Sequence, residues 1–432
     1  MTRGSSLDFG AIHHFKEIHI MDFISCQARD ALAGLRVLDL SGPMGNYAGK
    51  LFAELGADVV LVEPPQGSAL RHQPPYLDDT PGIEASLAFA YHNTSKRGIT
   101  LDLDAPNDQD RLRTLITSCD LVIETAVPGA MAARGLDYGA LAKLRPGLVM
   151  LSITPFGQTG PYAHYQAEDI VALALGGFLS LGGYADSAPM RVHGDQAILC
   201  ANMYGAVAAM VALTQAELTG RGEHIDVSMQ EAVVLAMENA VQFYDLEGTV
   251  RKRWAGEQRF AGTGVYACSD GHVFLMAGGI GANRFWERTI KWFADEDMVG
   301  AEEFLLPKWQ QVEYLQSDEA KRRFNDIFLP WAAPRTKASL YHAGQARQIP
   351  IAPVNTPVDI LESAQLRSRG HFVDVAGAAA GRTLRMPGAP YKLSGTPWRV
   401  QRPAPRLGQH NEEIWREAGR GVHAAAAAEV SP

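Results

Sequence analysis

Residues 35–63 read LRVLDLSGPMGNYAGKLFAELGADVVLVE, and this stretch decides the fold. Its two apolar runs, at 35–40 and 57–63, flank a Gly/Pro turn and a helical stretch over 46–56. Short apolar runs on either side of a helix-length segment predict a strand, a helix and a second, parallel strand. The sequence therefore predicts an α/β protein built on a parallel sheet.

Further units of the same kind follow. Apolar strand patterns recur at 98–103, 119–124, 147–154 and 224–228, with helical stretches between most of them. The turn after the 147–154 pattern, PFGQTGP, is rich in Gly and Pro. Loops at the carboxyl ends of parallel strands are where such sheets bind ligands. We therefore expect a ligand site at these turns.

The acid that closes the second strand, Glu63, raises the possibility of a dinucleotide site, in which it would bind a ribose hydroxyl. The first turn does not fit, because residues 41–49 contain no G-x-G-x-x-G and Pro43 removes one N–H donor. A nicotinamide or flavin dehydrogenase is therefore disfavoured. Glu63 is expected to face solvent or a basic neighbour.

The polar turn His193-Gly194-Asp195-Gln196 leads into a long apolar helix over 197–218. An Asp in that place accepts hydrogen bonds from the first free backbone N–H groups, and the helix dipole favours its charged form. The same geometry suits a nucleophile, because those N–H groups can also stabilise an oxyanion. On local sequence alone, Asp195 is more often an ordinary N-cap than a catalytic group.

Bulk properties exclude several classes of protein. The length of 432 residues predicts two domains, and a formal net charge of -9 argues against nucleic acid as a partner. The longest apolar runs, near 170–182 and 197–213, are interrupted and predict no membrane span. Residues 1–30 do not resemble a secretory signal. The four cysteines are widely spaced, which suggests neither zinc nor disulfides and fits a reducing cytoplasm: Cys26, Cys119, Cys200 and Cys268.

A change in composition marks a second domain. The charged stretch near 245–265 is expected to be a linker, and residues 262–279 predict a hairpin that turns at Ser-Asp-Gly. Amphipathic helices are expected around 285–293 and 320–328. The C-terminal part is too rich in Pro and Gly for a packed unit of its own, so it is expected to wrap over the rest.

Several separated motifs together resemble one family. They are GLRVLDL with LGADVVLVEPP, NTSKRGITLDL, the PG and RGL pattern at 128–136, FGQTGP, the pair Gly194-Asp195, TGRGEHIDVSMQEA, IPIAPV and RPAPRLGQH. In this order, from about Leu32 to Glu413, they resemble the class III CoA-transferases of the carnitine and bile-acid CoA-transferase type. The resemblance implies a Rossmann-like large domain with a smaller α+β domain, in an interlocked homodimer. The bounds it implies are an N-terminal extension at 1–30, the large domain at 31–245, the linker and small domain at 246–355, and a C-terminal segment at 356–432 that returns to the large domain.

The resemblance also implies an activity. Asp195 matches the family's nucleophilic aspartate, which takes an acyl group from a CoA thioester as a mixed anhydride and then carries CoA as an aspartyl thioester to an acceptor acid. Acyl-CoA and a carboxylic acid would be the substrates, with no permanently bound cofactor and no metal. The pair of acids stays open, as does transfer within one substrate.

Other site residues are also carried over from the resemblance. Asp169 and Gly194 are implied near the substrate, and seven residues are implied in CoA contact: Arg71, Asn93, Lys96, Arg97, Thr125, Arg134 and Met229. The chain departs from the family pattern at three of its motifs. Met44-Gly45-Asn46 replaces Ala-Gly-Pro, Thr125 replaces a frequent Asn, and the expected Arg is shifted to Arg134.

Two alternatives remain. The 2-methylacyl-CoA racemases share the fold but use a His and an Asp as acid and base, where this chain has Ala167-Glu168-Asp169. Without that His, racemisation lacks one partner. A non-catalytic CoA-binding or scaffold protein is the other alternative, and it would form no covalent adduct on Asp195.

Overall fold

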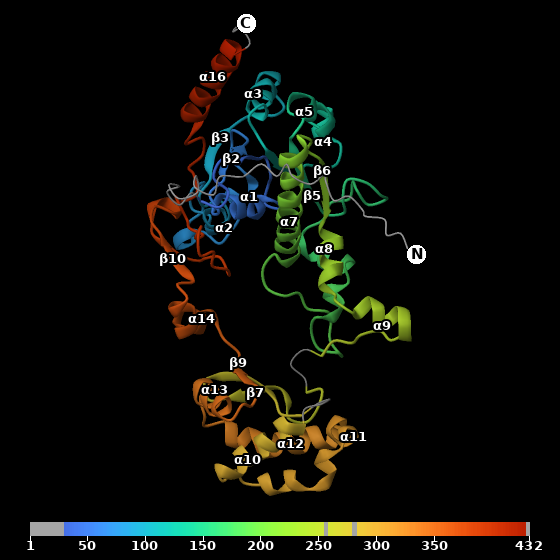
Figure 1. Cartoon of the computed structure of the whole chain (residues 1–432). Coiled ribbons are helices and arrows are strands. Elements are labelled where there is room, and N and C mark those ends of the chain that lie inside the picture. The colour runs from blue at the N-terminus through green and yellow to red at the C-terminus, as the bar shows by residue number, and fades with distance from the viewer. Residues whose placement is uncertain (1–29, 255–257, 279–282, 429–432) are drawn as a thin grey trace, which may run out of the picture.

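The computed structural model describes residues 30–254, 258–278 and 283–428. The expected N-terminal extension lies outside this range except for its last residue. Figure 1 shows an upper unit built on the parallel sheet and a lower unit, joined by two chain segments.

The upper unit is organised around a six-stranded sheet in the order β3-β2-β1-β4-β5-β6, in which every neighbouring pair is parallel. The strands are β1 Arg36–Asp39, β2 Asp58–Glu63, β3 Arg97–Thr100, β4 Leu121–Glu124, β5 Val149–Thr154 and β6 His224–Ser228. Five of them lie within the stretches that the sequence predicts as strands, and β3 begins one residue before its predicted stretch. This order, which reverses direction between β1 and β4, is that of a doubly wound α/β fold.

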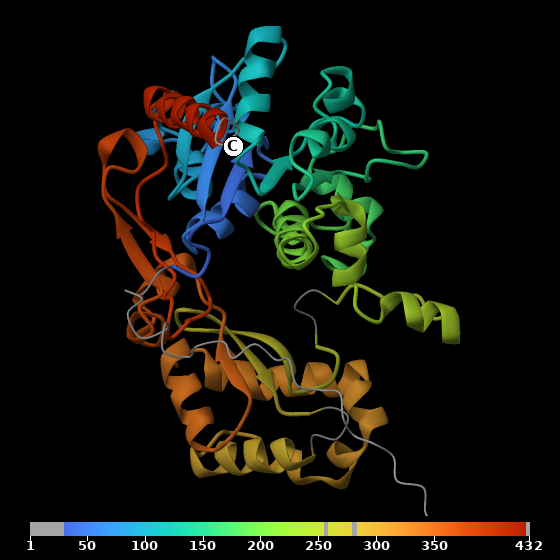
Figure 2. The ribbon, with the colours of Figure 1, turned by 45° about the horizontal axis from the view of Figure 1, so that its top comes forward.

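Helices cover both faces of the sheet. Successive strand residues point to opposite faces, so Val37 and Leu121 pack in one core and Leu38 and Val122 in the other. The first core includes residues of α1 Asn46–Ala53, α6 Asp169–Leu175, α7 Gln196–Thr219 and α8 Met229–Ala236. The second includes residues of α3 Pro106–Ile116, α4 Ala130–Ala133, α5 Tyr138–Leu144 and α16 Asn411–Ala428. Figure 2 shows this layered arrangement from another direction.

Small residues make up most of the buried face of helix α7, which packs against the sheet. These are Ala197, Ala201, Gly205, Ala206, Ala209, Ala212 and Ala216. A Cβ at Gly205 would lie 3.3 Å from the Leu151 methyl carbons on β5. By length and composition α7 is the one described helix that could cross a membrane, whereas its interrupted apolar run predicts no span. In this structure, α7 is packed on a sheet.

Gly49 in α1 provides a stability test. Replacing a helical Gly by Ala normally stabilises a protein by about 1 kcal/mol. Here the new Cβ would lie 2.3 Å from Asp39 Oδ2 and 3.0 Å from Lys96 Nζ, two buried charged groups. We expect Gly49→Ala to lower the free energy of unfolding by about 2 kcal/mol, measured by denaturant unfolding. Gly419→Ala, where the Cβ meets nothing within 4 Å, is the control and should not destabilise. Equal stability of both variants would contradict the prediction.

The lower unit has a core of its own. Strands β7 Thr263–Cys268 and β8 Gly271–Met276 form the predicted hairpin, and β9 Ile351–Pro353 adds antiparallel to β8. Four helices complete the unit: α10 Asn283–Asp295, α11 Val312–Gln316, α12 Asp318–Ala332 and α13 Lys337–Ala346. The predicted amphipathic helices at 285–293 and 320–328 are confirmed as parts of α10 and α12. Stacked and edge-on aromatic rings fill this core, as with Trp286 on Trp309 at 5.6 Å.

The C-terminal segment returns to the sheet after α14 Pro357–Glu362, α15 Ala364–Ser368 and the hairpin β10 Phe372–Val375 with β11 Leu384–Pro387. Its end contacts the edge strand β3 directly. The His410 N–H donates to the Gly98 carbonyl at 2.9 Å, and the Gly98 and Thr100 N–H groups donate to His410 Nδ1 and Asn411 Oδ1. Helix α16 follows, although the sequence predicted no packed element in this Pro- and Gly-rich part.

Candidate functional site

A cavity of about 550 Å³ opens at the carboxyl ends of the central strands. It lies beside the turns that follow β1 and β4, where the strand order reverses, and this is the place at which doubly wound sheets bind ligands. Its size suits a small-molecule site. The lining residues are Met44, Thr125, Ala126, Val127, Pro128, Thr154, Pro155, Ala163, His164, Tyr165, Gln166, Ala167, Glu168 and Val171. We take this cavity as the candidate ligand site.

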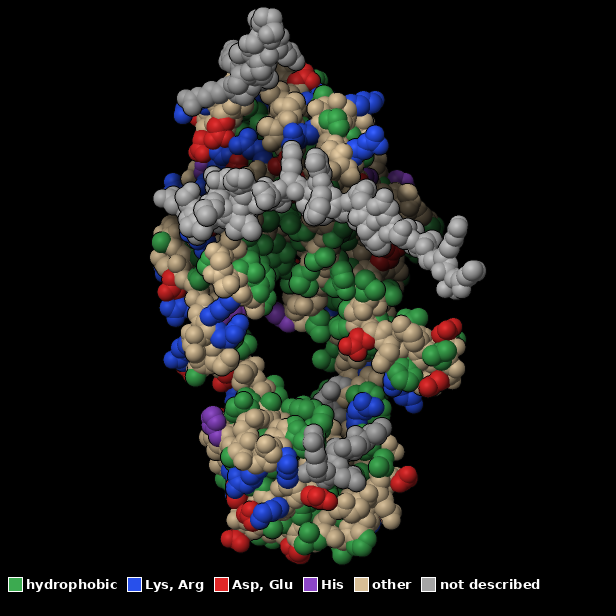
Figure 3. Space-filling view, viewed as in Figure 1, with side chains coloured by type: hydrophobic (Ala, Val, Ile, Leu, Met, Phe, Trp, Pro, Cys, Tyr) green, Lys and Arg blue, Asp and Glu red, His purple; other side chains and the backbone are tan. Residues whose placement is uncertain are grey.

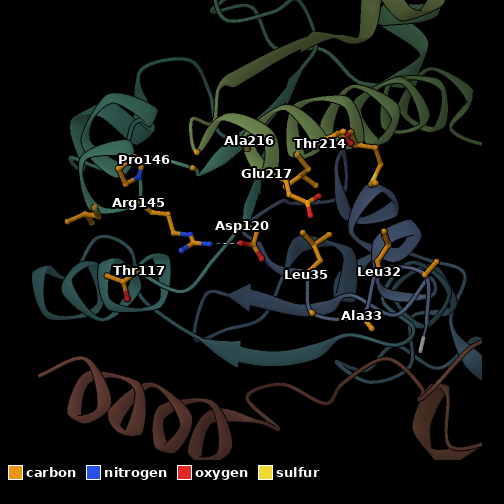
Figure 4. A pocket seen from close by; sticks show the side chains of 17 residues that line it. Leu32, Ala33, Leu35, Thr117, Asp120, Arg145, Pro146, Thr214, Ala216 and Glu217 are labelled. Atoms are coloured by element: carbon orange, nitrogen blue, oxygen red, sulfur yellow. Dashed lines mark hydrogen bonds and ion pairs between the residues drawn. The ribbon is translucent and has the colours of Figure 1, made fainter. Parts of the chain in front are cut away.

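A larger cavity of about 930 Å³ lies at the opposite end of the sheet (Figure 4). Its walls come from the chain before β1, the residues that precede β4 and β5, and the C-terminal half of α7. The ion pair between Arg145 and Asp120, at 2.7 Å, crosses it. Because the amino ends of parallel strands are not where such sheets place their ligand loops, this cavity is not the candidate site.

Asp195 stands at the N-terminus of α7, as the sequence predicts, but its expected hydrogen bonds are absent. Its side chain accepts no N–H of the helix, and 59% of it is exposed. It forms an ion pair with Arg191 at 3.8 Å. The preceding Gly194 has φ +80°, a conformation that favours glycine and turns the chain into the helix. The capping expectation for Asp195 is therefore wrong, and the carboxylate is free of capping hydrogen bonds.

The residue that caps α7 is Asp169. Its Oδ1 accepts the N–H groups of Ala197 at 2.7 Å and Ile198 at 3.1 Å, although Asp169 itself lies in the first turn of α6. Burial raises the pKa of this carboxyl, the two N–H groups lower it, and the nearby charge of Asp195 raises it further. Glu168 lines the 550 Å³ cavity, whereas Asp169 and Asp195 do not, so Asp169 links the cavity wall to α7 only through its neighbour in the chain.

Lys96 and Asn93, two of the expected CoA contacts, lie together in a buried polar cluster. Lys96 Nζ donates to Asp39 Oδ2 at 2.7 Å, to the Asn46 carbonyl at 2.7 Å and to Asn93 Oδ1 at 2.8 Å. The Lys96, Asp39 and Asn93 side chains are all fully buried. Burial lowers the pKa of Lys96 while Asp39 raises it. In this structure the cluster ties the first turn of α1 to β1 and β3.

His92, next to this cluster, predicts a pH dependence of stability. Burial and the charges of Lys96 and Lys50 lower its pKa from 6.5 to about 4, and its ring packs beside Tyr47 and Tyr91. Between these pH values the unfolded chain binds a proton that the folded chain does not, so stability is lost as pH falls from 6.5 to 4. We expect this loss to reach about 3 kcal/mol and to be absent in His92→Phe. Thermal unfolding of both proteins across this range measures it, and parallel pH profiles would contradict it.

Arg71 and Arg97, also expected to contact CoA, are engaged in ion pairs. Arg71 is fully buried, donates from Nε and Nη2 to both oxygens of Glu63, and also pairs with Glu84 at 2.9 Å. Glu63 thus faces a basic neighbour, one of the two options left by the sequence. Arg97 binds Asp58 on β2, and the pair Glu413 and Glu417 on α16.

The remaining expected contacts are dispersed. Thr125 lines the 550 Å³ cavity and its hydroxyl accepts the Gly42 N–H at 2.8 Å. Arg134 pairs with Asp104 near the surface, and Met229 is fully buried at the start of α8. Of the seven expected contacts, only Thr125 lines this cavity. Their roles in CoA binding stay predictions.

Several cavity residues, among them Tyr165 and Val171, were not singled out from the sequence. The signal was present, because the turns at 41–45 and 155–160 are the Gly- and Pro-rich loops expected to bind ligands. The loop over 163–168, which supplies six lining residues, carries no comparable motif. Within the described ranges, no group of three or more His, Cys, Asp or Glu side chains could hold a metal ion.

The protein has a doubly wound sheet, a cavity where the strand order reverses, and an exposed carboxylate at a helix N-terminus. These features define a class of α/β ligand-binding protein. Comparison with known proteins specifies the class further. The family described as CoA-transferase family III matches residues 32–411. The chain therefore belongs to CoA-transferase family III and is an enzyme of that family.

The relatives agree. The chain is 39% identical over 389 residues to the succinyl-CoA:(R)-benzylsuccinate CoA-transferase subunit BbsE of Thauera aromatica. The aligned region covers 89% of this chain and 93% of that protein. It is 30% identical over 394 residues to succinate–glutarate CoA-transferase of Agrobacterium fabrum, at 89% and 95% coverage. Among solved structures, a CAIB/BAIF family protein from Brucella suis matches with a TM-score of 0.79 and 25% identity, covering 90% of this chain and all of that one.

Proposed function

We propose that this enzyme transfers CoA from an acyl-CoA thioester to a free carboxylic acid, with Asp195 as the nucleophile. The observation that carries the proposal is the state of Asp195. Its carboxylate lies at the positive end of α7, without a capping hydrogen bond and with most of its side chain exposed. A carboxylate nucleophile needs an unoccupied lone pair with which to attack the thioester carbonyl carbon.

The proposed chemistry has two matched halves. An Asp195 oxygen attacks the thioester carbonyl carbon, the C–S bond breaks with its electron pair on sulfur, and a mixed anhydride forms. The CoA thiolate then attacks Asp195 Cγ, which releases the donor acid and leaves an aspartyl-CoA thioester. The acceptor carboxylate attacks the same carbon and expels the thiolate. The thiolate finally attacks the acceptor carbonyl, which forms the new thioester and frees Asp195. No metal or permanently bound cofactor takes part, because the thioester bond energy is conserved throughout.

The 550 Å³ cavity is the proposed site for the CoA thioester. The turns after β1, β4 and β5 line it, and its wall includes Thr125, whose hydroxyl accepts the Gly42 N–H. Asp169 and Gly194 are proposed beside the acyl group, because both adjoin Asp195. The other candidates for CoA contact remain Arg71, Asn93, Lys96, Arg97, Arg134 and Met229. Of these, Arg134 has a side chain that is 31% exposed.

For the acids, we propose succinyl-CoA as donor and a dicarboxylic acid as acceptor. Succinyl-CoA or succinate stands in the names of both relatives described above, and both acceptors named there, benzylsuccinate and glutarate, are dicarboxylates. Apolar residues such as Met44, Val127 and Val171 on the cavity wall suit an acceptor with an apolar body. We place the reaction in the cytoplasm, with neither nucleic acid nor membrane as partner.

We further propose that the active enzyme is a dimer, interlocked as the family resemblance implies. Side chains on α7 and α8 expose large apolar groups, and Figure 3 shows hydrophobic side chains gathered over this region. Val207 and Val211 are 65% and 66% exposed. An apolar face of this extent is typical of a protein interface. Since one relative is named as a subunit, a homologous partner chain is the alternative to a second copy.

Oligomerisation is testable at this face. Val207→Asp with Val211→Asp should convert the purified dimer to monomer in analytical ultracentrifugation, while Asn107→Asp on α3 should not. A wild-type protein that is monomeric alone but associates with a co-expressed homologue would favour the two-chain alternative. A double variant that remains dimeric would contradict the proposed interface.

The proposed function is tested by trapping the covalent intermediate. Purified protein is incubated with succinyl-CoA, treated with hydroxylamine and analysed by peptide mass spectrometry. The proposal predicts a hydroxamate on Asp195 that depends on the thioester, and CoA transfer to at least one acid in a dicarboxylate panel. An unmodified Asp195 with transfer intact would overturn the nucleophile. The racemase alternative is not favoured by the relatives, and it predicts proton exchange at the acyl α-carbon with no adduct.

A further inference from the structure

The N-terminus of α7 is capped by a residue from another helix. Asp169, in the first turn of α6, stands 26 positions before Asp195 in the sequence and accepts the Ala197 and Ile198 N–H groups with a single oxygen, Oδ1. These are the donors that the residue at the N-cap position normally binds. Asp195 occupies that position and binds neither.

This arrangement determines what Asp195 can do. A carboxylate that accepts two backbone N–H groups has its lone pairs engaged, and hydrogen bonding to its charged form makes it a weaker base and a weaker nucleophile. With these donors bound to Asp169, Asp195 stays near the helix dipole while its oxygens remain free. Its one ion-pair partner among the described residues, Arg191, is 3.8 Å away and has a side chain that is 42% exposed.

The surroundings of Asp169 hold its side chain in place. Its residue is 4% exposed, and its second oxygen, Oδ2, has no hydrogen-bond partner in the described part of the chain. Leaving a buried carboxyl oxygen without a partner is costly. Burial and the neighbouring charge of Asp195 both raise the pKa of Asp169. Such a cost in a helix cap suggests that the placement serves the neighbouring group.

We propose that Asp169 is a positioning residue, which occupies the α7 amide donors so that the Asp195 carboxylate remains free to attack the thioester. The inference rests on the proposed function and deepens it, because it assigns Asp169 to the nucleophile's state rather than to substrate binding. It applies to both halves of the reaction, since Asp195 must be released uncapped after each transfer.

Two substitutions separate this role from others. Asp169→Ala removes the acceptor, so Asp195 becomes the available cap, and kcat should fall about 100-fold with KM for the CoA donor changed less than about threefold. Asp169→Asn keeps an oxygen that can accept both N–H groups, so kcat should fall only about fivefold. An acid–base role would make the two variants equally poor, and a substrate-binding role would raise KM. Either outcome would overturn the proposal.

A second helix cap in the same protein provides the control that distinguishes a loss of stability from a loss of catalysis. Asp137 caps α5 by accepting the Ala140 N–H at 3.2 Å, away from Asp195, so Asp137→Ala should lower the thermal midpoint without the loss in kcat. A readout independent of turnover is the pH titration of the Ala197 and Ile198 amide NMR signals. They should follow Asp169 in the wild type and Asp195 in Asp169→Ala. Amide signals that follow Asp195 in the wild type would overturn the inference. A wild type with no CoA transfer but Asp169-linked signals would instead overturn the proposed function alone.

Discussion

Asp195→Asn is expected to lower kcat for CoA transfer by on the order of 10⁴-fold or more. The amide matches the carboxylate in shape but carries no negative charge, so it cannot form the anhydride with the donor acyl group. Because the side chain is exposed and makes no capping bond, the substitution should leave the fold and its thermal midpoint unchanged. The effect is measured as the steady-state rate at which the new thioester forms from succinyl-CoA and the acceptor acid.

The matched control is Asp186→Asn, at an exposed loop residue. It makes the same chemical change away from the α7 N-terminus and should retain wild-type transfer. Hydroxylamine should trap an adduct in the control and none in Asp195→Asn. Substantial transfer by a freshly prepared Asp195→Asn protein, verified by mass to contain no deamidated Asp, would reject the covalent mechanism and reopen the non-covalent alternatives.

Lys96→Met is expected to cause the largest loss of stability, about 3–5 kcal/mol in the free energy of unfolding. The substitution leaves Asp39 charged, buried and without its ammonium partner, and it deprives Asn93 Oδ1 and the Asn46 carbonyl of a donor. Breaking one side of a buried pair costs far more than removing both. The double variant Asp39→Asn with Lys96→Met should therefore recover part of the loss. Denaturant unfolding measures all three proteins.

The surface substitution Lys143→Met is the comparison, and its effect should stay within about 0.5 kcal/mol. The outcome also bears on the CoA contact that the family resemblance implies for Lys96. A Lys96→Met protein as stable as the wild type, but with KM for succinyl-CoA raised, would assign Lys96 to the ligand and contradict its structural role in the buried cluster.

The sheet was largely predictable because each of its strands is a short apolar run that local sequence makes visible. Position along the chain also identified Asp195 as the residue at the start of α7. The lack of a capping hydrogen bond at Asp195 was not predictable. The residue that caps α7 in its place, Asp169, reaches this helix only because α6 packs beside it. The same limit applies to the basic residues. Nothing near Arg97 in the sequence indicates that Glu413, more than 300 residues later, neutralises it.

The C-terminal segment was predicted only in part. Its Pro and Gly content correctly suggested an extended path over the rest of the molecule, but α16 at its end was missed. The helix is held by contacts that local composition cannot reveal, such as Ile414 in the core of one sheet face and Glu417 beside Arg97. Sequence alone places an element where its own residues determine it, and fails where a distant partner does.

The contact between His410, Asn411 and β3 has a consequence for assembly. An outer strand with unpaired backbone groups can recruit a strand from another molecule, which leads to strand exchange and fibril growth. Here the chain's own C-terminal residues occupy backbone groups of Gly98 and Thr100. That border of the sheet is closed to intermolecular β-pairing, so subunits that associate on this side have to do so through helices and loops.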